Sequence, residues 1–168
     1  EIEKIVEEYI LKNPETILKS VDDYQQKAMS ERQTDAVKNN ASNLFEDDRT
    51  PFIGNAKGDV TIVEFFDYNC GYCKKAYSEL KKLVTADKNV KVVLKDFPIL
   101  GPTSETAAKW ALAAHKQKKY EIFHDKLMEN RMPISDDLLA KIAKDSGIDA
   151  DQAKADAEST DILIQIEK

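Results

Sequence analysis

Residues 60–73 read Val-Thr-Ile-Val-Glu-Phe-Phe-Asp-Tyr-Asn-Cys-Gly-Tyr-Cys, and this stretch decides the fold. Its first seven residues are mostly β-branched or aromatic, a pattern typical of a short strand that is buried on both faces. The cysteines at its end lie three positions apart, and they are the only two among the 168 residues. We therefore predict a buried strand over residues 60–66 that leads into a helix beginning at Cys70.

The residues on either side complete a strand–helix–strand unit. The predicted helix extends to about Val84, and residues 90–95 form a second β-branched, apolar run. Two strands joined by one helix pair in parallel with a right-handed crossover. Residues 52–53 are expected to add a short strand, and residues 54–59 form a turn. The sequence thus predicts an α/β domain that begins near Pro51.

The spacing of the two cysteines favours redox chemistry over metal binding. A zinc site needs four ligands, and beyond the cysteines the sequence offers only His115 and His124 as soft ligands, too far apart for a paired motif. An iron–sulfur cluster needs four thiolates. A disulfide that closes so short a loop would stabilise the fold very little. We therefore expect a thiol–disulfide exchange pair, with no metal and no bound cofactor.

Cys70 is predicted to be the nucleophile of this pair. The first turn of a helix has unpaired N–H groups and the positive end of the helix dipole, and both lower the pKa of a thiol. Cys73, one turn further along, can then attack the mixed disulfide that Cys70 forms. Gly71 is expected to keep the turn compact, and Tyr72 to offer a surface to the incoming polypeptide.

Glu64 interrupts the apolar strand at a position where burial of a carboxylate is costly. In a functional interpretation, Glu64 accepts the proton of Cys73 as this thiol attacks the mixed disulfide. In a structural interpretation, Glu64 faces water at the end of the strand or pairs with Lys95 on the neighbouring strand. We favour the functional interpretation, and we expect turn and capping roles for Asp67 and Asn69.

Helical patterns occupy both ends of the chain. Apolar residues recur at helical spacing over 2–10 and 17–28, and the intervening Asn13-Pro14-Glu15 is typical of a helix start. The polar residues 30–43 fit either a solvated helix or a linker. Further helices are predicted over 103–117, 120–128, 136–144 and from Asp149 toward Lys168. We expect Trp110 in the core, and no chemical role for His115 or His124.

Composition excludes several classes of protein. With 25 basic and 31 acidic side chains, the net charge of −6 argues against a nucleic-acid partner. No apolar run approaches the roughly 20 residues of a membrane-spanning helix. The chain begins at Glu1 without a signal peptide, so we expect a processed or trimmed product.

Residues 58–74 resemble the active-site region of DsbA-family thioredoxin-fold oxidoreductases, and especially the ScsC-like branch with an N-terminal helical extension. Residues 95–101 and 12–15 are similar to that branch too. The resemblance implies a thioredoxin-like α/β fold over residues 46–168, with a helical insertion at about 103–161. It also implies a helical stalk over residues 1–45 that joins subunits. It assigns the nucleophile to Cys70, the resolving thiol to Cys73 and the buried strand carboxylate to Glu64.

One feature departs from the family pattern. The family's fold ends with a cis-proline loop, two antiparallel strands and a final helix, whereas the last proline here is Pro133, inside the insertion. We therefore expect that these C-terminal strands and the final helix are missing from a truncated chain.

The resemblance also implies a function. We expect a periplasmic disulfide isomerase, homo-oligomeric through residues 1–45, that acts on cysteine-containing unfolded or misfolded secreted proteins and has a membrane redox partner. Supporting roles fall to Glu64, Gly71, Tyr72 and Lys95. A monomeric dithiol oxidase of the DsbA type is the alternative enzyme. A copper-binding or chaperone module, holding copper(I) between the two thiols, is the alternative outside catalysis.

Overall fold

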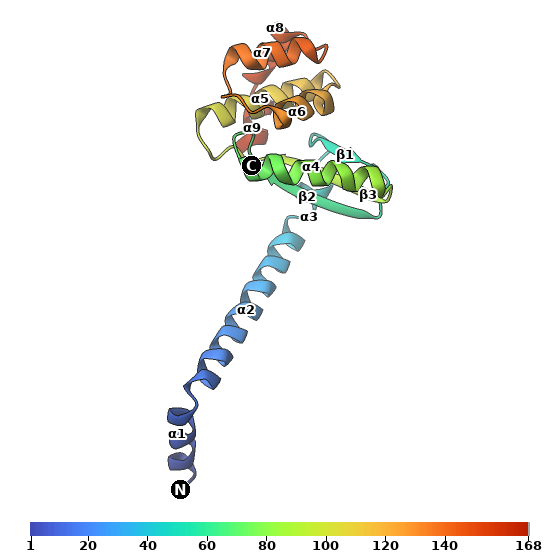
Figure 1. The fold of residues 1–168 in the computed structure, drawn as a ribbon. Helices are drawn as coiled ribbons and strands as arrows, with labels where there is room; N and C mark the ends of the chain where they lie inside the picture. Colours follow the sequence, from blue (N-terminus) through green and yellow to red (C-terminus); the bar gives the residue numbers. More distant parts are fainter. Residues whose placement is uncertain (168) are drawn as a thin grey trace. The chain divides into compact units, whose positions relative to one another are not determined.

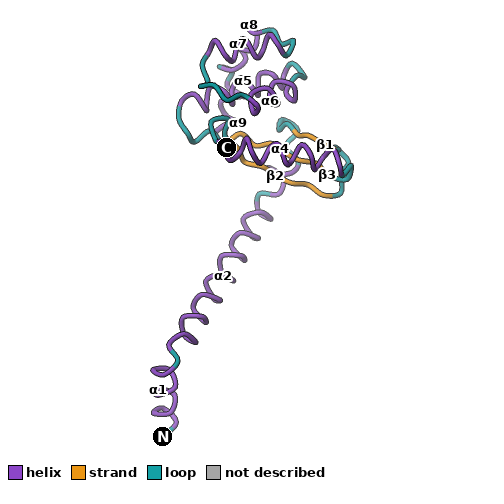
Figure 2. The backbone as a smooth tube through the Cα atoms, viewed as in Figure 1, coloured by secondary structure: helices purple, strands orange, loops and turns teal. Residues whose placement is uncertain are grey.

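The computed structural model describes residues 1–167, and the chain divides into two units, Glu1–Glu46 and Asp47–Lys168. Lys168, the predicted end of the second domain, lies outside the described residues. Figure 1 labels the elements, and Figure 2 colours them by type; in chain order they are α1 (Ile2–Lys12), α2 (Pro14–Asn39), α3 (Ala41–Phe45), β1 (Phe52–Gly54), β2 (Val60–Phe66), α4 (Gly71–Ala86), β3 (Val90–Asp96), α5 (Pro102–Lys116), α6 (Tyr120–Glu129), α7 (Asp136–Asp145), α8 (Ala150–Ala157) and α9 (Thr160–Glu167). Among these helices none is both long and apolar enough to cross a membrane.

The first unit is helical, and none of the residues in its helices is buried. Asn13 separates α1 from α2, because its side-chain amide donates to the carbonyl oxygen of Tyr9 (2.8 Å) and closes the end of α1. Pro14 then occupies the first position of α2, where its missing N–H costs nothing. The polar segment 30–43 is a solvated helix for most of its length, since α2 continues to Asn39.

The second unit contains a three-stranded sheet in the order β1-β3-β2 within residues 1–167. Strands β2 and β3 run parallel, in a register that places Val60 beside Val90 and Phe66 beside Asp96. Helix α4 connects them, as predicted, and packs on β3 and β1. Strand β1 pairs with the other edge of β3 in the antiparallel direction. The predicted α/β class and strand–helix–strand unit are therefore confirmed. The predicted burial of residues 60–66 on both faces is wrong, because β2 lies at the edge of the described sheet and only Phe66 among its residues is buried.

Five helices, α5 to α9, follow the sheet (Figure 2). Helix α5 lies at the centre of this group and packs against α6, α7, α8 and α9. Eight of its residues are buried, and Trp110 is among them, as expected. The apolar face of α6 is buried as well, including the ring of His124. This helical layer provides most of the core of the second unit.

The prediction of one last helix from Asp149 was wrong, because two helices, α8 and α9, occupy that segment. The chain turns at Glu158 and Ser159, where the Ser159 hydroxyl donates to the carbonyl oxygen of Asp156 (2.5 Å). A local side-chain hydrogen bond of this kind competes with helix continuation. Neither a proline nor a glycine marks the break in the sequence.

Candidate active site

Cys70 occupies the N-cap position of α4, at the junction between the β2 strand end and the helix. Its backbone is extended, and its Sγ accepts a hydrogen bond from the backbone N–H of Cys73 (3.3 Å). The hydrogen bond from the Cys73 thiol, followed by the N–H groups of Cys73 and Tyr72, lowers the pKa of the Cys70 thiol. Since these groups stabilise the thiolate, Cys70 has the properties of a nucleophile.

Cys73 lies one turn inside α4 and packs against the core. Burial raises the pKa of its thiol, and the hydrogen bond to Cys70 and the nearby carboxylate of Glu64 raise this pKa further. The pKa of one thiol of this motif is therefore lower than that of an ordinary cysteine, and the pKa of the other is higher. Cys70 is set up to attack, while Cys73 holds its proton until a base removes it.

Glu64 lies near the C-terminal end of β2, in register with Leu94 of β3. Burial raises the pKa of its carboxyl group from 4.5 to about 7. Its Oε2 atom is buried without a hydrogen-bond partner among residues 1–167. A carboxyl group that titrates near neutral pH, close enough to raise the pKa of Cys73, is suited to receive a proton from that thiol.

Lys95 lies in register with Phe65 rather than with Glu64. Because successive side chains of a strand point to opposite faces, Glu64 and Lys95 lie on opposite faces of the sheet. The considered pairing of these two residues was therefore wrong. Lys95 Nζ instead donates to the hydroxyl of Thr50 (2.8 Å), and burial lowers the pKa of its ammonium group.

Gly71 and Tyr72, the two residues between the cysteines, both have open space around them. A Cβ atom at Gly71 would meet no heavy atom within 4 Å, and its φ lies outside the left-handed region. The local geometry thus does not require glycine, although its small size leaves open space next to Cys70. Tyr72 is 87% exposed, so its ring stands free at the start of α4.

The loop before Cys70 contains contacts that the sequence did not reveal. The carboxylate of Asp67 accepts hydrogen bonds from the backbone N–H groups of Asn69 (2.8 Å) and Leu100 (2.9 Å), so it has the expected turn role and also holds the loop after β3. The Tyr68 hydroxyl lies 2.7 Å from Nδ1 of His124 on α6. Asn69 caps no helix, since Cys70 itself is the N-cap.

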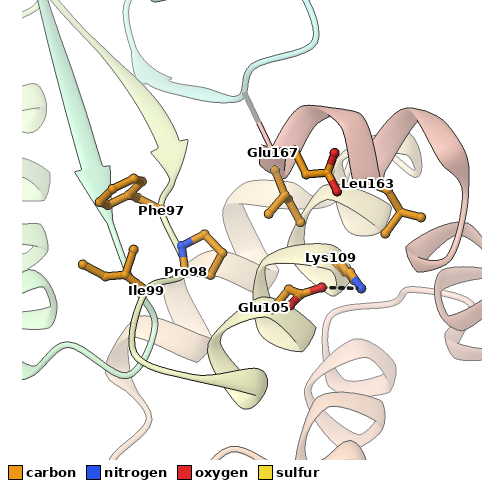
Figure 3. Close-up of a pocket in the computed structure, with 8 residues that line it drawn as sticks. Phe97, Pro98, Ile99, Glu105, Lys109, Leu163 and Glu167 are labelled. Carbon is orange, nitrogen blue, oxygen red and sulfur yellow. Dashed lines mark ion pairs between the residues drawn. The ribbon is translucent and has the colours of Figure 1, made fainter.

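A groove of about 250 Å³ lies between the segment 97–99 and helices α5 and α9, and Figure 3 shows its walls. Phe97, Pro98 and Ile99 supply one side. An ion pair between Glu105 and Lys109 (2.7 Å) lies on the α5 side. Neither cysteine lines the groove, so it is separate from the thiol pair.

Across residues 1–167, no group of three or more histidine, cysteine, aspartate or glutamate side chains is close enough to hold a metal ion. His124 is enclosed by aromatic rings, and burial lowers its pKa to about 3. Its ring is therefore part of the packed core.

A thiol pair at the N-terminus of helix α4, which connects the parallel strands β2 and β3, is typical of a thiol–disulfide oxidoreductase of the thioredoxin type. Residues 61–168 match the DSBA-like thioredoxin domain, and the chain belongs to this family. Residues 1–29 match the N-terminal domain of the copper resistance protein ScsC. The predicted DsbA-like membership, ScsC-like branch and thioredoxin-like fold are therefore confirmed.

Individual proteins resemble the chain over most of its length. "Probable disulfide bond formation protein D" of Bacillus cereus is 28% identical over 144 residues, which make up 78% of this chain and 67% of that protein. The structure of a thioredoxin-like oxidoreductase from Silicibacter pomeroyi has a TM-score of 0.73 and 44% identity, covering 75% of this chain and 73% of its own. The catalytic domain of Proteus mirabilis ScsC has a TM-score of 0.71 and 25% identity, with coverage of 79% and 74%.

Proposed function

We propose that the chain exchanges disulfides with cysteine-containing polypeptides, with Cys70 as nucleophile, Cys73 as resolving thiol and Glu64 as proton acceptor. The observation that carries the proposal is the opposite displacement of the two thiol pKa values, lowered at Cys70 and raised at Cys73. Thiolates attack disulfides, whereas thiols do not, so this difference assigns the first attack to Cys70.

The reaction proceeds by two sulfur–sulfur exchanges. The Cys70 thiolate attacks one sulfur of a substrate disulfide, forms a mixed disulfide and releases the other substrate sulfur as a thiolate. If that thiolate attacks a second disulfide of the substrate, the thiolate released there can attack the mixed disulfide. Cys70 then leaves as a thiolate, and the substrate is isomerised without net redox change. If Cys73 attacks instead, its proton passes to Glu64, and the second substrate sulfur leaves as a thiolate. The Cys70–Cys73 pair is then oxidised, and the substrate is reduced by two electrons.

We favour the isomerase outcome, in an oligomer formed through α1. Apolar side chains recur along one face of this helix, and Ile2 (79%), Val6 (50%) and Ile10 (41%) are largely exposed. Exposed apolar stripes of this kind are normally covered by a partner, and a second copy of the chain supplies a matching stripe. The match of residues 1–29 to the ScsC N-terminal domain supports the same placement of the interface.

The alternative enzyme, a dithiol oxidase, differs from an isomerase in the direction of electron transfer. A DsbA-type dithiol oxidase would act as a monomer and would donate a Cys70–Cys73 disulfide to reduced substrates, then be reoxidised by a membrane partner. A copper(I)-binding module is a further candidate. Residues 1–29 match a domain of a copper resistance protein, and paired thiolates are soft ligands that suit copper(I).

The proposed compartment is the periplasm. Protein disulfides persist in oxidising compartments, and reducing systems remove them in the cytosol. The proposed substrates are accordingly secreted proteins that are unfolded or carry wrong disulfides, and a membrane redox protein would set the oxidation state of the thiol pair.

Refolding of scrambled ribonuclease by the reduced chain tests the proposal. We expect the wild-type chain to restore ribonuclease activity, Cys70→Ser to abolish it, and Cys73→Ser to accumulate a mixed disulfide with the substrate. Ser78→Ala, on the exposed side of α4, serves as the matched control and should retain activity.

Full activity of the Cys70→Ser variant would overturn the proposed mechanism. Oxidation of reduced ribonuclease by the oxidised chain, without isomerisation of the scrambled form, would select the oxidase. Stoichiometric copper(I) binding without either exchange activity would select the copper module.

A further inference from the structure

Asn69, the residue directly before Cys70, connects the nucleophile's loop to the helical layer. Its side-chain Nδ2 donates hydrogen bonds to Oγ1 of Thr103 (3.0 Å) and to Oγ of Ser104 (2.9 Å). Both hydroxyls belong to the first turn of α5. One amide group thus joins the active-site loop to a helix whose residues are 34 and 35 positions away in the sequence.

The partners of Asn69 differ in exposure, and the difference indicates a specific contact. Asn69 and Thr103 are exposed, whereas Ser104 is 0% exposed. A buried hydroxyl is costly unless it forms a hydrogen bond. Asn69 provides this bond. The side-chain amide of Asn69 is therefore anchored to a buried residue of the helical layer, and not only to the exposed Thr103.

Two neighbouring contacts hold the same loop from other sides. Asp67 binds the backbone of Leu100, and Tyr68 binds His124. Asp67 and Tyr68 are themselves buried, so they also serve the core. Asn69 is the exposed member of the three and the one covalently attached to Cys70.

The thiolate of Cys70 depends on accurate placement. Its Sγ lies 3.3 Å from the N–H of Cys73, and hydrogen bonds weaken steeply as distance grows and angles fall. A small rotation of the backbone at position 69 moves the N-cap residue away from the first turn of α4. The contact of Asn69 with α5 opposes that rotation.

We propose that Asn69 is a positioning residue for thiol–disulfide exchange, which holds Cys70 at the first turn of α4 by anchoring the preceding backbone to Thr103 and Ser104 of α5. The inference rests on the proposed function in that Cys70 is taken as the exchanging thiol. It assigns the helical layer a direct part in the reactivity of the sulfur.

The test is the pH dependence of alkylation of Cys70 by iodoacetamide, measured in the full chain with Cys73→Ser so that one thiol titrates. Asn69→Leu keeps the side-chain size and removes the donor. Thr103→Val/Ser104→Ala removes both acceptors without touching the residue beside Cys70. We expect either change to raise the pKa of Cys70 by about one unit, which lowers the thiolate fraction about tenfold below that pKa.

Combination of all three substitutions should raise the pKa of Cys70 no further than either change alone, because both remove the same contact. Asn55→Leu is the matched control. Asn55 is also exposed, and its amide donates to the carbonyl oxygen of Lys88 (2.7 Å), near the start of β3 and away from Cys70. This variant should leave the pKa of Cys70 unchanged.

An unchanged pKa in Asn69→Leu, or a rise in Asn69→Leu that the α5 double variant does not reproduce, would overturn the proposal. Asn69 and Thr103 are exposed, so Asn69→Leu and Thr103→Val are expected to fold even if the loss of the Ser104 hydroxyl destabilises the chain. Failure of the proposed function is distinguishable, since it appears as activity in Cys70→Ser, whereas this titration reads the thiol itself.

Discussion

The hydroxyl of Tyr68 lies 2.7 Å from Nδ1 of His124, within a buried cluster that joins the active-site loop to helix α6. The His124 ring stacks on Tyr120 and meets Tyr77 and Phe66 edge to face. Since His124 is 0% exposed, its charged form is strongly disfavoured, and its pKa falls from 6.5 to about 3. The active-site loop therefore rests on a histidine that must remain neutral.

The buried histidine predicts acid sensitivity. The unfolded chain binds a proton at His124 near pH 6.5 and the folded chain only near pH 3, so the free energy of unfolding should fall as the pH decreases through this range. The contribution of this residue is on the order of several kcal/mol. Urea denaturation at a series of pH values measures it. His124→Phe should be less stable at pH 7, by about 1 to 3 kcal/mol for the unpaired Tyr68 hydroxyl, but should lose less stability on acidification.

His115→Phe is the control for this experiment, because His115 is only half-buried and its pKa is lowered by the same cause. His115→Phe should change the loss of unfolding free energy at low pH less than His124→Phe does. If the free energy of unfolding depends on pH equally in His124→Phe and in the wild-type chain, the acid sensitivity does not come from His124.

Glu64 predicts a pH-dependent resolution step. Its pKa of about 7 means that the carboxylate becomes available as a proton acceptor as the pH rises through neutrality. The rate at which Cys73 resolves the mixed disulfide should rise over the same range. Glu64→Gln should slow this step by at least about tenfold above pH 7 and flatten its pH profile. Stopped-flow release of a fluorescent peptide from the mixed disulfide provides the measurement.

The same substitution should stabilise the fold at high pH. The folded chain holds the Glu64 proton up to about pH 7 and the unfolded chain only to about 4.5, so ionisation destabilises the folded state progressively between these values. Glu64→Gln removes this loss, a gain on the order of 1 kcal/mol after allowance for partial solvent access. Glu79→Gln, exposed on α4, should leave the resolution rate unchanged. A resolution profile identical in Glu64→Gln and wild type would remove Glu64 from the mechanism.

The apolar face of α1 predicts self-association. Val6→Glu/Ile10→Glu places two charges on this face, so we expect the oligomer to dissociate into monomers while the exchange activity of each thiol pair persists. Multi-angle light scattering measures the mass. Lys4→Ala, on the other side of α1, should leave the mass unchanged. A wild-type chain that is already monomeric would contradict the oligomer and favour the dithiol oxidase.

Local pattern was sufficient for the strands, because β-branched and aromatic residues favour extended backbone even in β2, where only Phe66 is buried. The predicted strand 60–66 coincides with β2, and the predicted strand 90–95 ends one residue before β3 does. The helix predicted from Cys70 begins at Gly71. The end of α8 was missed, because the turn at Ser159 depends on a hydrogen bond from its hydroxyl to the carbonyl oxygen of Asp156, and no proline or glycine marks it.

The site could be predicted only in part, because much of it depends on contacts across the chain. The cysteine pair is visible in four consecutive letters. The faces of Glu64 and Lys95 depend on strand register, and a shift of one residue reverses them. The link from Asn69 to Ser104 joins segments 35 positions apart, and no local pattern marks it. The only sequence feature that hinted at this link is the polar run at residues 67–69 before Cys70, and this run fits ordinary turn chemistry equally well.

Trp110 is the single tryptophan of the chain and is 5% exposed, within α5. Its fluorescence therefore reports the packing of the helical layer alone, while circular dichroism receives signal from every helix, including α1 and α2. A first unit that melts independently would change ellipticity and leave tryptophan emission constant. One ordinary sample thus carries two optical probes that separate the melting of the two units without any added label.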